Sequence, residues 1–219
     1  STLSISKKTV INDFLKQYNS APFAKSLRVK WLNYLKANKF ENAFIEAHMP
    51  NVSTKLDCHY LNLQLARNVD IQLLDESISR IWRSSKSLPR YCDQTLDVWK
   101  QAGLLTPDRY LDRIKLAVKA KQYRLARYLK SSLPESMQYV VELWIKAKRT
   151  PSSIKNKGFW LKYNEYEFEI AEYAIAKWVF TNPEESYQWW QKQGKFAFKH
   201  IDAIRVAKIN KQIAIGLAV

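Results

Sequence analysis

The stretch LLTPDRYLDRIKLAVKA, residues 104–120, combines a helix start with a helical run of apolar residues. Thr106 can cap a helix, Pro107 suits its first turn, and Asp108 puts a negative charge at the positive end of the helix. The stretch therefore predicts a helix from about residue 107 to residue 120. Its apolar side consists of residues three or four positions apart: Tyr110, Leu111, Ile114, Ala117 and Val118. Its basic residues fall largely elsewhere on the helix: Arg109, Arg113, Lys115 and Lys119.

Helical spacing of apolar residues recurs along almost the whole chain. Short breaks at 20–22, 38–39 and 48–50 divide the apolar runs, as expected for helices joined into hairpins. Segments 36–43 and 119–126 resemble each other, because each places an alanine, an aromatic residue and a second alanine three positions apart across a corner. Only four glycines and seven prolines occur, which favours helices over a turn-rich β structure. The predicted fold is all-α, a superhelix of antiparallel helix hairpins over 1–219, with the best candidate for a bend at 149–158.

The composition limits the classes of protein that need to be considered. With 219 residues, 47% hydrophobic, the chain can bury the core of one large or two small domains. Its formal net charge of +16 is spread from Lys7 to Lys211 and calls for a partner such as nucleic acid, anionic lipid or an acidic polymer. No run approaches the roughly 20 apolar residues that span a bilayer, so no membrane span is predicted.

The chain contains two cysteines, Cys58 and Cys92, which allow one intrachain pairing. They can form a disulfide or remain two small core residues. A zinc site that also used His59 would need a fourth ligand. A cysteine nucleophile would need a nearby base, and the sequence nominates none beyond His59, whose side chain should point off a different face of the helix. From the residues alone, the disulfide and the pair of core thiols both stay open.

Three carboxylates at helical spacing, Glu165, Glu169 and Glu172, raise the question of acid–base catalysis. No Asp or His partner accompanies them, so the better interpretation is a solvated face that balances basic neighbours. The sequence has no phosphate-binding loop, dinucleotide-binding glycine pattern or His-Glu-x-x-His motif, and no cofactor or metal is predicted.

Aromatic and basic residues interleave at 123–130 and 187–192. Such rings can stack on sugars or bases while the cations meet carboxylates or phosphates. Tyrosine and tryptophan also fill helix corners for purely structural reasons, and that reading covers most of them.

Several motifs together resemble the soluble lytic murein transglycosylases, in the α-superhelical domain of that family. They are Cys92-Asp93, Val98-Trp99, Ala102-Gly103, the run YLDRIKLA at 110–117, and Lys119-Ala120. The earlier pieces Cys58-His59-Tyr60, Ile81-Trp82 and Leu88-Pro89 resemble the region of the family that holds the partner cysteine. The resemblance spans nearly all of the chain. It implies a Cys58–Cys92 disulfide, an open ring or horseshoe of helices, and a periplasmic location.

The catalytic unit of that family is a lysozyme-like C-terminal domain, marked by a Glu-Ser pair that precedes Gly-Leu-Met-Gln. The pairs Glu76-Ser77, Glu135-Ser136 and Glu185-Ser186 occur here, but none is followed by that motif. No catalytic residue is therefore carried over, and the catalytic domain is expected to lie outside this chain. The apolar stripe of 209–219 fits the same expectation, since it is predicted to pack on a following helix.

By resemblance, the parent enzyme cleaves the β-1,4 bond between N-acetylmuramic acid and N-acetylglucosamine and leaves a 1,6-anhydro end. The expected partners of this non-catalytic segment are peptidoglycan glycan strands and the parent enzyme's own catalytic domain. The alternatives are a basic helical-repeat nucleic-acid binder, which the paired cysteines disfavour, and an independent interaction scaffold. The candidate glycan contacts are basic and aromatic residues of 109–130: Arg109, Arg113, Tyr123, Arg124, Arg127 and Lys130.

Overall fold

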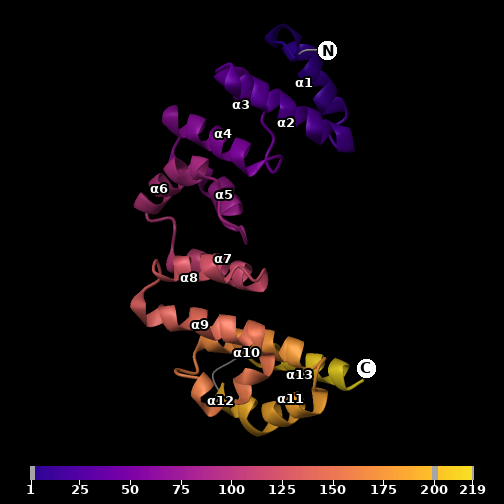
Figure 1. Ribbon diagram of the computed structural model, residues 1–219, viewed down its shortest axis with the longest axis vertical. Coiled ribbons are helices and arrows are strands. Elements are labelled where there is room, and N and C mark those ends of the chain that lie inside the picture. Colours follow the sequence, from indigo (N-terminus) through magenta and orange to yellow (C-terminus); the bar gives the residue numbers. More distant parts are fainter. Residues whose placement is uncertain (1–2, 199–201, 219) are drawn as a thin grey trace. The chain divides into compact units, whose positions relative to one another are not determined.

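A computed structural model describes residues 3–198 and 202–218 of the chain. Within these residues the regular structure consists of helices, with no β-strand, which confirms the all-α prediction (Figure 1). The chain folds into two compact units, Ser1–Arg109 and Tyr110–Val219. None of the described helices is long and apolar enough to cross a membrane.

The first unit contains the helices from α1 to α6 and the start of α7. Consecutive helices pack against each other, as in the α2–α3, α4–α5 and α5–α6 pairs. Their bounds are α1 Lys8–Gln17, α2 Pro22–Ala37, α3 Glu41–Ala47, α4 Thr54–Ala66, α5 Ile71–Trp82 and α6 Asp93–Gln101, with short 3-10 helices η1 at Ile5–Lys7 and η2 at Arg90–Cys92.

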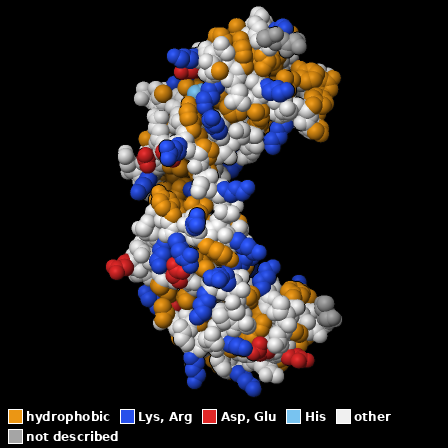
Figure 2. All heavy atoms as spheres, in the orientation of Figure 1, with side chains coloured by type: hydrophobic (Ala, Val, Ile, Leu, Met, Phe, Trp, Pro, Cys, Tyr) orange, Lys and Arg blue, Asp and Glu red, His pale blue; other side chains and the backbone are white. Residues whose placement is uncertain are grey.

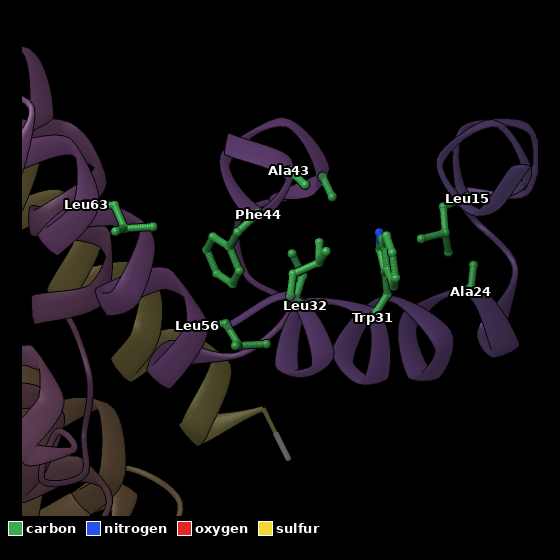
Figure 3. Packing of buried hydrophobic residues seen from close by; sticks show 10 residues of the cluster. Leu15, Ala24, Trp31, Leu32, Ala43, Phe44, Leu56 and Leu63 are labelled. Atoms are coloured by element: carbon green, nitrogen blue, oxygen red, sulfur yellow. The ribbon is translucent and has the colours of Figure 1, made fainter. Parts of the chain in front are cut away.

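The core of the first unit lies where α1, α2 and α3 meet (Figure 3). The Trp31 side chain is fully buried and lies between Leu15 and Leu32 (Figure 3). Its indole Nε1 donates a hydrogen bond of 3.0 Å to Oδ1 of Asn12, so the one polar atom of this ring has a partner. Phe44 of α3 lies on the other side of Leu32 in the same core (Figure 3). The apolar residues at helical spacing in α1, α2 and α3 therefore form the buried sides of these helices.

The second unit contains most of α7 (Pro107–Lys119) and the helices that follow it. Here α10 packs on α9 and on α13, and α11 packs on α13. The bounds are α8 Tyr123–Lys130, α9 Glu135–Arg149, α10 Glu165–Trp178, α11 Pro183–Trp189, α12 Lys195–Ala197 and α13 Ala203–Leu217, with 3-10 helices η3 at Pro151–Lys155 and η4 at Lys157–Phe159 and a π-helical turn η5 at Trp190–Gly194.

The helix predicted from residues 104–120 is α7, and its start and apolar side are as expected. Thr106 Oγ1 accepts a hydrogen bond from the backbone N–H of Arg109 at 3.4 Å, and the five predicted apolar residues are all buried. Arg113 is the exception among the basic residues, because it is also buried, with 4% of its surface exposed. The unit boundary falls inside α7, while the stretch 149–158 lies wholly in the second unit between α9 and α10.

In the described parts of the chain, 3–198 and 202–218, four helices end in the same way, with one residue in the left-handed conformation. These residues are Lys39, Asn68, Gly103 and Lys121, with φ between 58° and 74°. The next residue then donates a backbone hydrogen bond to the carbonyl five positions back, as in Phe40 to Leu35 at 2.9 Å and Gln122 to Ala117 at 2.8 Å. The two corners that resembled each other in the sequence thus share one turn geometry, and the second alanine of each, Ala43 and Ala126, is buried.

The last helix, α13, is tied into the second unit. Ile209 and Ile213 are buried, and a Cβ placed on Gly216 would lie 2.8 Å from Cβ of Val179. The prediction that this stripe faces a following helix is therefore wrong at Ile209 and Ile213, because α10 and α11 of the same unit already cover α13. Ile215 and Leu217 remain exposed.

Candidate functional site

The two cysteines are joined in a disulfide within the first unit, as the family resemblance implied. Cys58 lies on α4 and Cys92 ends η2, their Cα atoms are 5.0 Å apart, and both side chains are buried. Nδ1 of the neighbouring His59 is hydrogen-bonded at 2.8 Å to the hydroxyl of Tyr91, and the disulfide leaves neither cysteine as a thiolate for the zinc site that was considered with His59. The bond fastens α4 to the start of α6, which are also in direct contact.

Arg109, a candidate glycan contact, is held in a structural cluster of the first unit. Its two terminal nitrogens donate to the two carboxylate oxygens of Asp75 at 2.5 and 2.7 Å, and its guanidinium lies 4.9 Å from the ring of Trp99. Trp99 Nε1 donates to the same carboxylate at 2.6 Å. The hydrogen bonds from Arg109 are the main cause that lowers the pKa of Asp75, and the same pairing raises the pKa of Arg109. Through these contacts with Asp75 and Trp99, the Arg109 side chain connects α7 to α5 and α6.

The Asp75 cluster predicts a defined pH dependence of stability. Because the folded pKa of Asp75 lies below the ordinary value of about 4, its contribution is fully present above that value and is lost as the pH falls through the folded pKa. Asp75→Asn is expected to lower the free energy of unfolding by about 2 kcal/mol at neutral pH and to flatten its decline below about pH 4. Urea denaturation from pH 7 to pH 3 measures both effects.

The control for this prediction is Asp97→Asn, since Asp97 is an exposed acid on the neighbouring helix α6. It is expected to change the free energy of unfolding by less than about 0.5 kcal/mol. If the two variants show the same loss and the same pH slope, the Asp75 cluster has no special role.

Arg113, the second candidate on α7, does not present its charge to a polymer. Its side chain is buried, and desolvation lowers its pKa to about 10. A buried guanidinium of this kind cannot reach a glycan strand without unpacking the helix. Arg109 and Arg113 are therefore not retained as glycan contacts.

The remaining candidates lie on α8, in the second unit. Ala126 and Leu129 bury one side of this helix, which leaves Arg124, Arg127 and Tyr128 on the exposed side at i, i+3 and i+4 spacing. Tyr128 is 75% exposed, and it was missed as a candidate although it lies inside the interleaved segment 123–130. Tyr123 and Lys130 are half-buried at the edges. We call Arg124, Arg127, Tyr128 and Lys130 the α8 face.

The charges of the α8 face are only partly compensated. Glu142 of α9 meets both Arg127, at 3.3 Å, and Lys130, at 3.4 Å, so one carboxylate serves two cations. No ion pair is found for Arg124 among residues 3–198 and 202–218. Figure 2 shows Lys and Arg side chains grouped in the region of α8. Three cations with one carboxylate leave a net positive face that also carries an exposed aromatic ring.

The three glutamates of α10 act as counter-charges, as interpreted from the sequence. Glu169 pairs with Lys115 at 2.6 Å, Glu172 pairs with Arg205 at 2.5 Å, and Glu165 also pairs with Arg205. The interpretation of a solvated face is wrong for Glu172, whose side chain is 15% exposed. Burial raises the pKa of Glu172, and the nearby charge of Glu169 adds to that shift. Each of the three carboxylates therefore has a basic partner within the second unit.

Comparison with known proteins identifies what this chain is similar to. No family model matches it. Over 168 residues, 76% of the chain, it is 24% identical to the soluble lytic murein transglycosylase of Salmonella typhimurium and 25% identical to that of Escherichia coli K12. Over these residues the chain is similar to the soluble lytic murein transglycosylases. The matched part is 26% of each of these relatives, so the chain spans about a quarter of their length.

Two solved structures of lytic transglycosylases share the fold. An inactive mutant of the lytic transglycosylase Slt from Pseudomonas aeruginosa superposes on 99% of this chain with a TM-score of 0.75 and 22% identity. The 70-kDa soluble lytic transglycosylase of Escherichia coli covers 96% with a TM-score of 0.66 and 20% identity. In each case the chain matches 34% of the solved structure.

The residues that carry the transglycosylase resemblance are mainly residues of the fold. Trp99, Leu111, Ile114 and Ala117 are buried, and Gly103 has the positive φ that ends α6. Two of the three Glu-Ser pairs begin helices, since Glu135 and Glu185 lie in the first turns of α9 and α11, and Glu185 also pairs with Lys155 at 2.5 Å. The motifs shared with the transglycosylases therefore correspond to buried core positions, a helix end and the disulfide.

Proposed function

We propose that this chain is a non-catalytic helical segment of a periplasmic lytic transglycosylase that supports the catalytic domain and contacts glycan strands through the α8 face. The parent enzyme would cleave the MurNAc–GlcNAc bond of peptidoglycan to 1,6-anhydro ends. The proposal rests on the sequence similarity to murein transglycosylases over three-quarters of the chain. The folds of two such enzymes also match nearly all of the chain. The Cys58–Cys92 disulfide supports an oxidising compartment such as the periplasm.

The chemistry of the α8 face fits a glycan that carries carboxylates. The exposed ring of Tyr128 offers an apolar surface on which a sugar can stack. Arg124 lies one helical turn from Tyr128 and Arg127 directly precedes it, and both can meet the lactyl or peptide carboxylates of peptidoglycan. Because Arg127 and Lys130 share Glu142 at distances above 3 Å, a ligand carboxylate can join this pair without first breaking a short ion pair.

The test is co-sedimentation of the chain with peptidoglycan sacculi, with excess duplex DNA and RNA as competitors. Retention on sacculi is expected to persist, and Arg124→Glu with Arg127→Glu is expected to reduce it about tenfold, since about 1.4 kcal/mol of ionic contact is removed. The matched control is Lys25→Glu with Lys30→Glu, which reverses two exposed charges on α2.

An equal loss of retention in both double variants would mean that net charge, and not the α8 face, drives binding. Unchanged retention in the α8 variant would overturn the glycan-contact role while leaving the structural role of the segment. Release of the wild-type chain from sacculi by nucleic acid would overturn the peptidoglycan assignment. Circular dichroism of each variant establishes that the helices are intact.

A further inference from the structure

A polar pocket lies in the first unit, between α1, α2 and the end of α3. Its volume of about 320 Å³ is within the range of small-molecule sites. Its walls are Asn12, Lys16, Asn19, Arg28, Glu46, Ala47, His48 and Met49. These residues come from separate helices and form no motif in the sequence.

The feature that sets this pocket apart is Arg28, a buried cation that has no carboxylate partner among residues 3–198 and 202–218. Its side chain is 9% exposed. Nη1 donates to the carbonyl oxygen of Ala47 at 3.3 Å, and Nη2 donates to the carbonyl oxygen of Leu15 at 3.0 Å and to Oδ1 of Asn19 at 3.3 Å. These bonds use three of the five N–H donors of a guanidinium. Two donors and the full charge are left for another partner.

Burial of an uncompensated charge is unfavourable, which makes the solitary position of Arg28 informative. Desolvation lowers the pKa of Arg28, as expected for a cation that is held away from water without a counter-ion. Buried charges in proteins are normally paired. An anion in the pocket would supply the missing partner.

The only carboxylate in the pocket wall, Glu46, is already occupied. It pairs with Lys8 at 2.5 Å and accepts a long hydrogen bond of 3.5 Å from Nδ2 of Asn12. Lys16 adds a further positive charge nearby, which helps to lower the pKa of Glu46 after the larger effect of Lys8. Three cations around one carboxylate, with Arg28 included, leave an excess of positive charge at the pocket.

His48 completes the wall without changing this balance. Its Nε2 is hydrogen-bonded to Oδ1 of Asp57 at 2.9 Å, and its ring stacks on Tyr60 at 4.1 Å between centroids. The carboxylate of Asp57 is therefore turned toward His48, and it also accepts from the backbone N–H of Asn51 at 3.3 Å. Neither group neutralises Arg28.

We infer that this pocket binds the carboxylate of a small acidic ligand, with Arg28 and Lys16 as its cationic partners and the amide of Asn19 at its edge. The two remaining guanidinium donors, on Nε and Nη1, point in different directions, and either one can donate to a carboxylate oxygen while the charge favours an anion. A peptide C-terminus and a sugar acid both carry this group. The inference does not depend on the α8 face, which belongs to the other compact unit.

The test is a titration of the full chain followed by NMR of backbone and side-chain amides. The acidic probes are acetyl-alanyl-alanine and N-acetylmuramic acid, each compared with its carboxamide, and inorganic phosphate serves as a competitor. At least one acid is expected to shift the amide signals of Asn12, Asn19 and Ala47 in a saturable way in the millimolar range. The acid that binds identifies the source, peptide terminus or sugar acid.

Two variants make the result specific. Arg28→Lys is expected to weaken binding about tenfold, because a lysine keeps the charge but loses the fixed donor directions of the guanidinium. Lys16→Gln changes an exposed residue that does not support the core and is expected to weaken binding about threefold, while Lys25→Gln on the same unit leaves it unchanged. The inference is overturned if neither acid shifts these amides at about 10 mM, if a carboxamide binds as well as its acid, if phosphate binds more tightly, or if Lys16→Gln has no effect.

Discussion

Removal of the Cys58–Cys92 bond is expected to lower the free energy of unfolding of the first unit by about 4 kcal/mol. The two cysteines are 34 positions apart, and closing a loop of that length restricts the unfolded chain by about this amount in the chain-entropy model. The double variant Cys58→Ala with Cys92→Ala tests the value. Native-state hydrogen exchange, followed in α4 and α6, measures the change where the bond acts.

The second unit provides the internal control for this experiment. Amide protection in α9 and α10 is expected to change little, since the bond closes a loop that lies wholly in the first unit. The oxidised wild type and the wild type reduced with dithiothreitol should differ in the same direction as the oxidised wild type and the double variant. A loss below about 1 kcal/mol in α4 and α6 would contradict the prediction.

Glu167→Ala is expected to lower the free energy of unfolding by about 3 kcal/mol, the second largest effect that we predict. Glu167 is fully buried, and its carboxylate accepts backbone hydrogen bonds from Leu161 at 3.1 Å, Lys162 at 3.0 Å and Tyr163 at 2.7 Å. Hydrogen bonds to a charged acceptor contribute about 1.5 to 3 kcal/mol each, and part of that is recovered when water reaches the exposed loop.

The same carboxylate explains an unusual backbone position. Tyr163 has a φ of 52°, a left-handed conformation that is unfavourable for a residue with a side chain. The N–H of Tyr163 makes the shortest of the three bonds to Glu167, so the carboxylate holds the loop in this geometry. Without it, residues 161–163 should open, and cleavage by a protease specific for lysine at Lys162 should become faster.

Two further variants test this account of Glu167. Glu167→Gln keeps one carbonyl oxygen but loses the charge and the second acceptor, and it is expected to lose about 2 kcal/mol. Glu184→Gln changes an exposed glutamate of the same unit and should cost less than about 0.5 kcal/mol. Urea denaturation ranks the three variants. Equal stabilities of Glu167→Ala and Glu184→Gln would refute the role of this carboxylate in the loop.

Local patterns in the sequence were sufficient for the helices and for much of the core. The start at Thr106-Pro107 and the apolar spacing that follows are properties of neighbouring residues, and the structure has α7 where they predict it. The disulfide was left open by composition and spacing and came from the resemblance to a family. Helix ends were harder to predict, because Lys39 and Lys121 take the left-handed conformation without the glycine that usually marks it.

The candidate site was predicted less well, and the reason is burial. Arg109 and Arg113 were predicted as surface cations. In the structure Arg109 is ion-paired with Asp75, and Arg113 is buried in the second unit. Sequence spacing gives the direction of a side chain around its own helix. It does not say which other helix will cover that direction. Of the predicted basic contacts, Arg124 and Arg127 keep exposed side chains on α8.

The sequence by itself determined an all-α chain with a strongly positive charge, because helix signals, composition and charge depend on residues close together or on simple sums. Only the tertiary structure decided which charges are free to act. Asp75 reaches Arg109, Glu142 reaches Arg127 and Lys130, and Arg28 is left without a carboxylate among the described residues. Electrostatic pairing depends on distances of a few ångströms between helices, and those distances are set by packing of segments that are far apart in the chain.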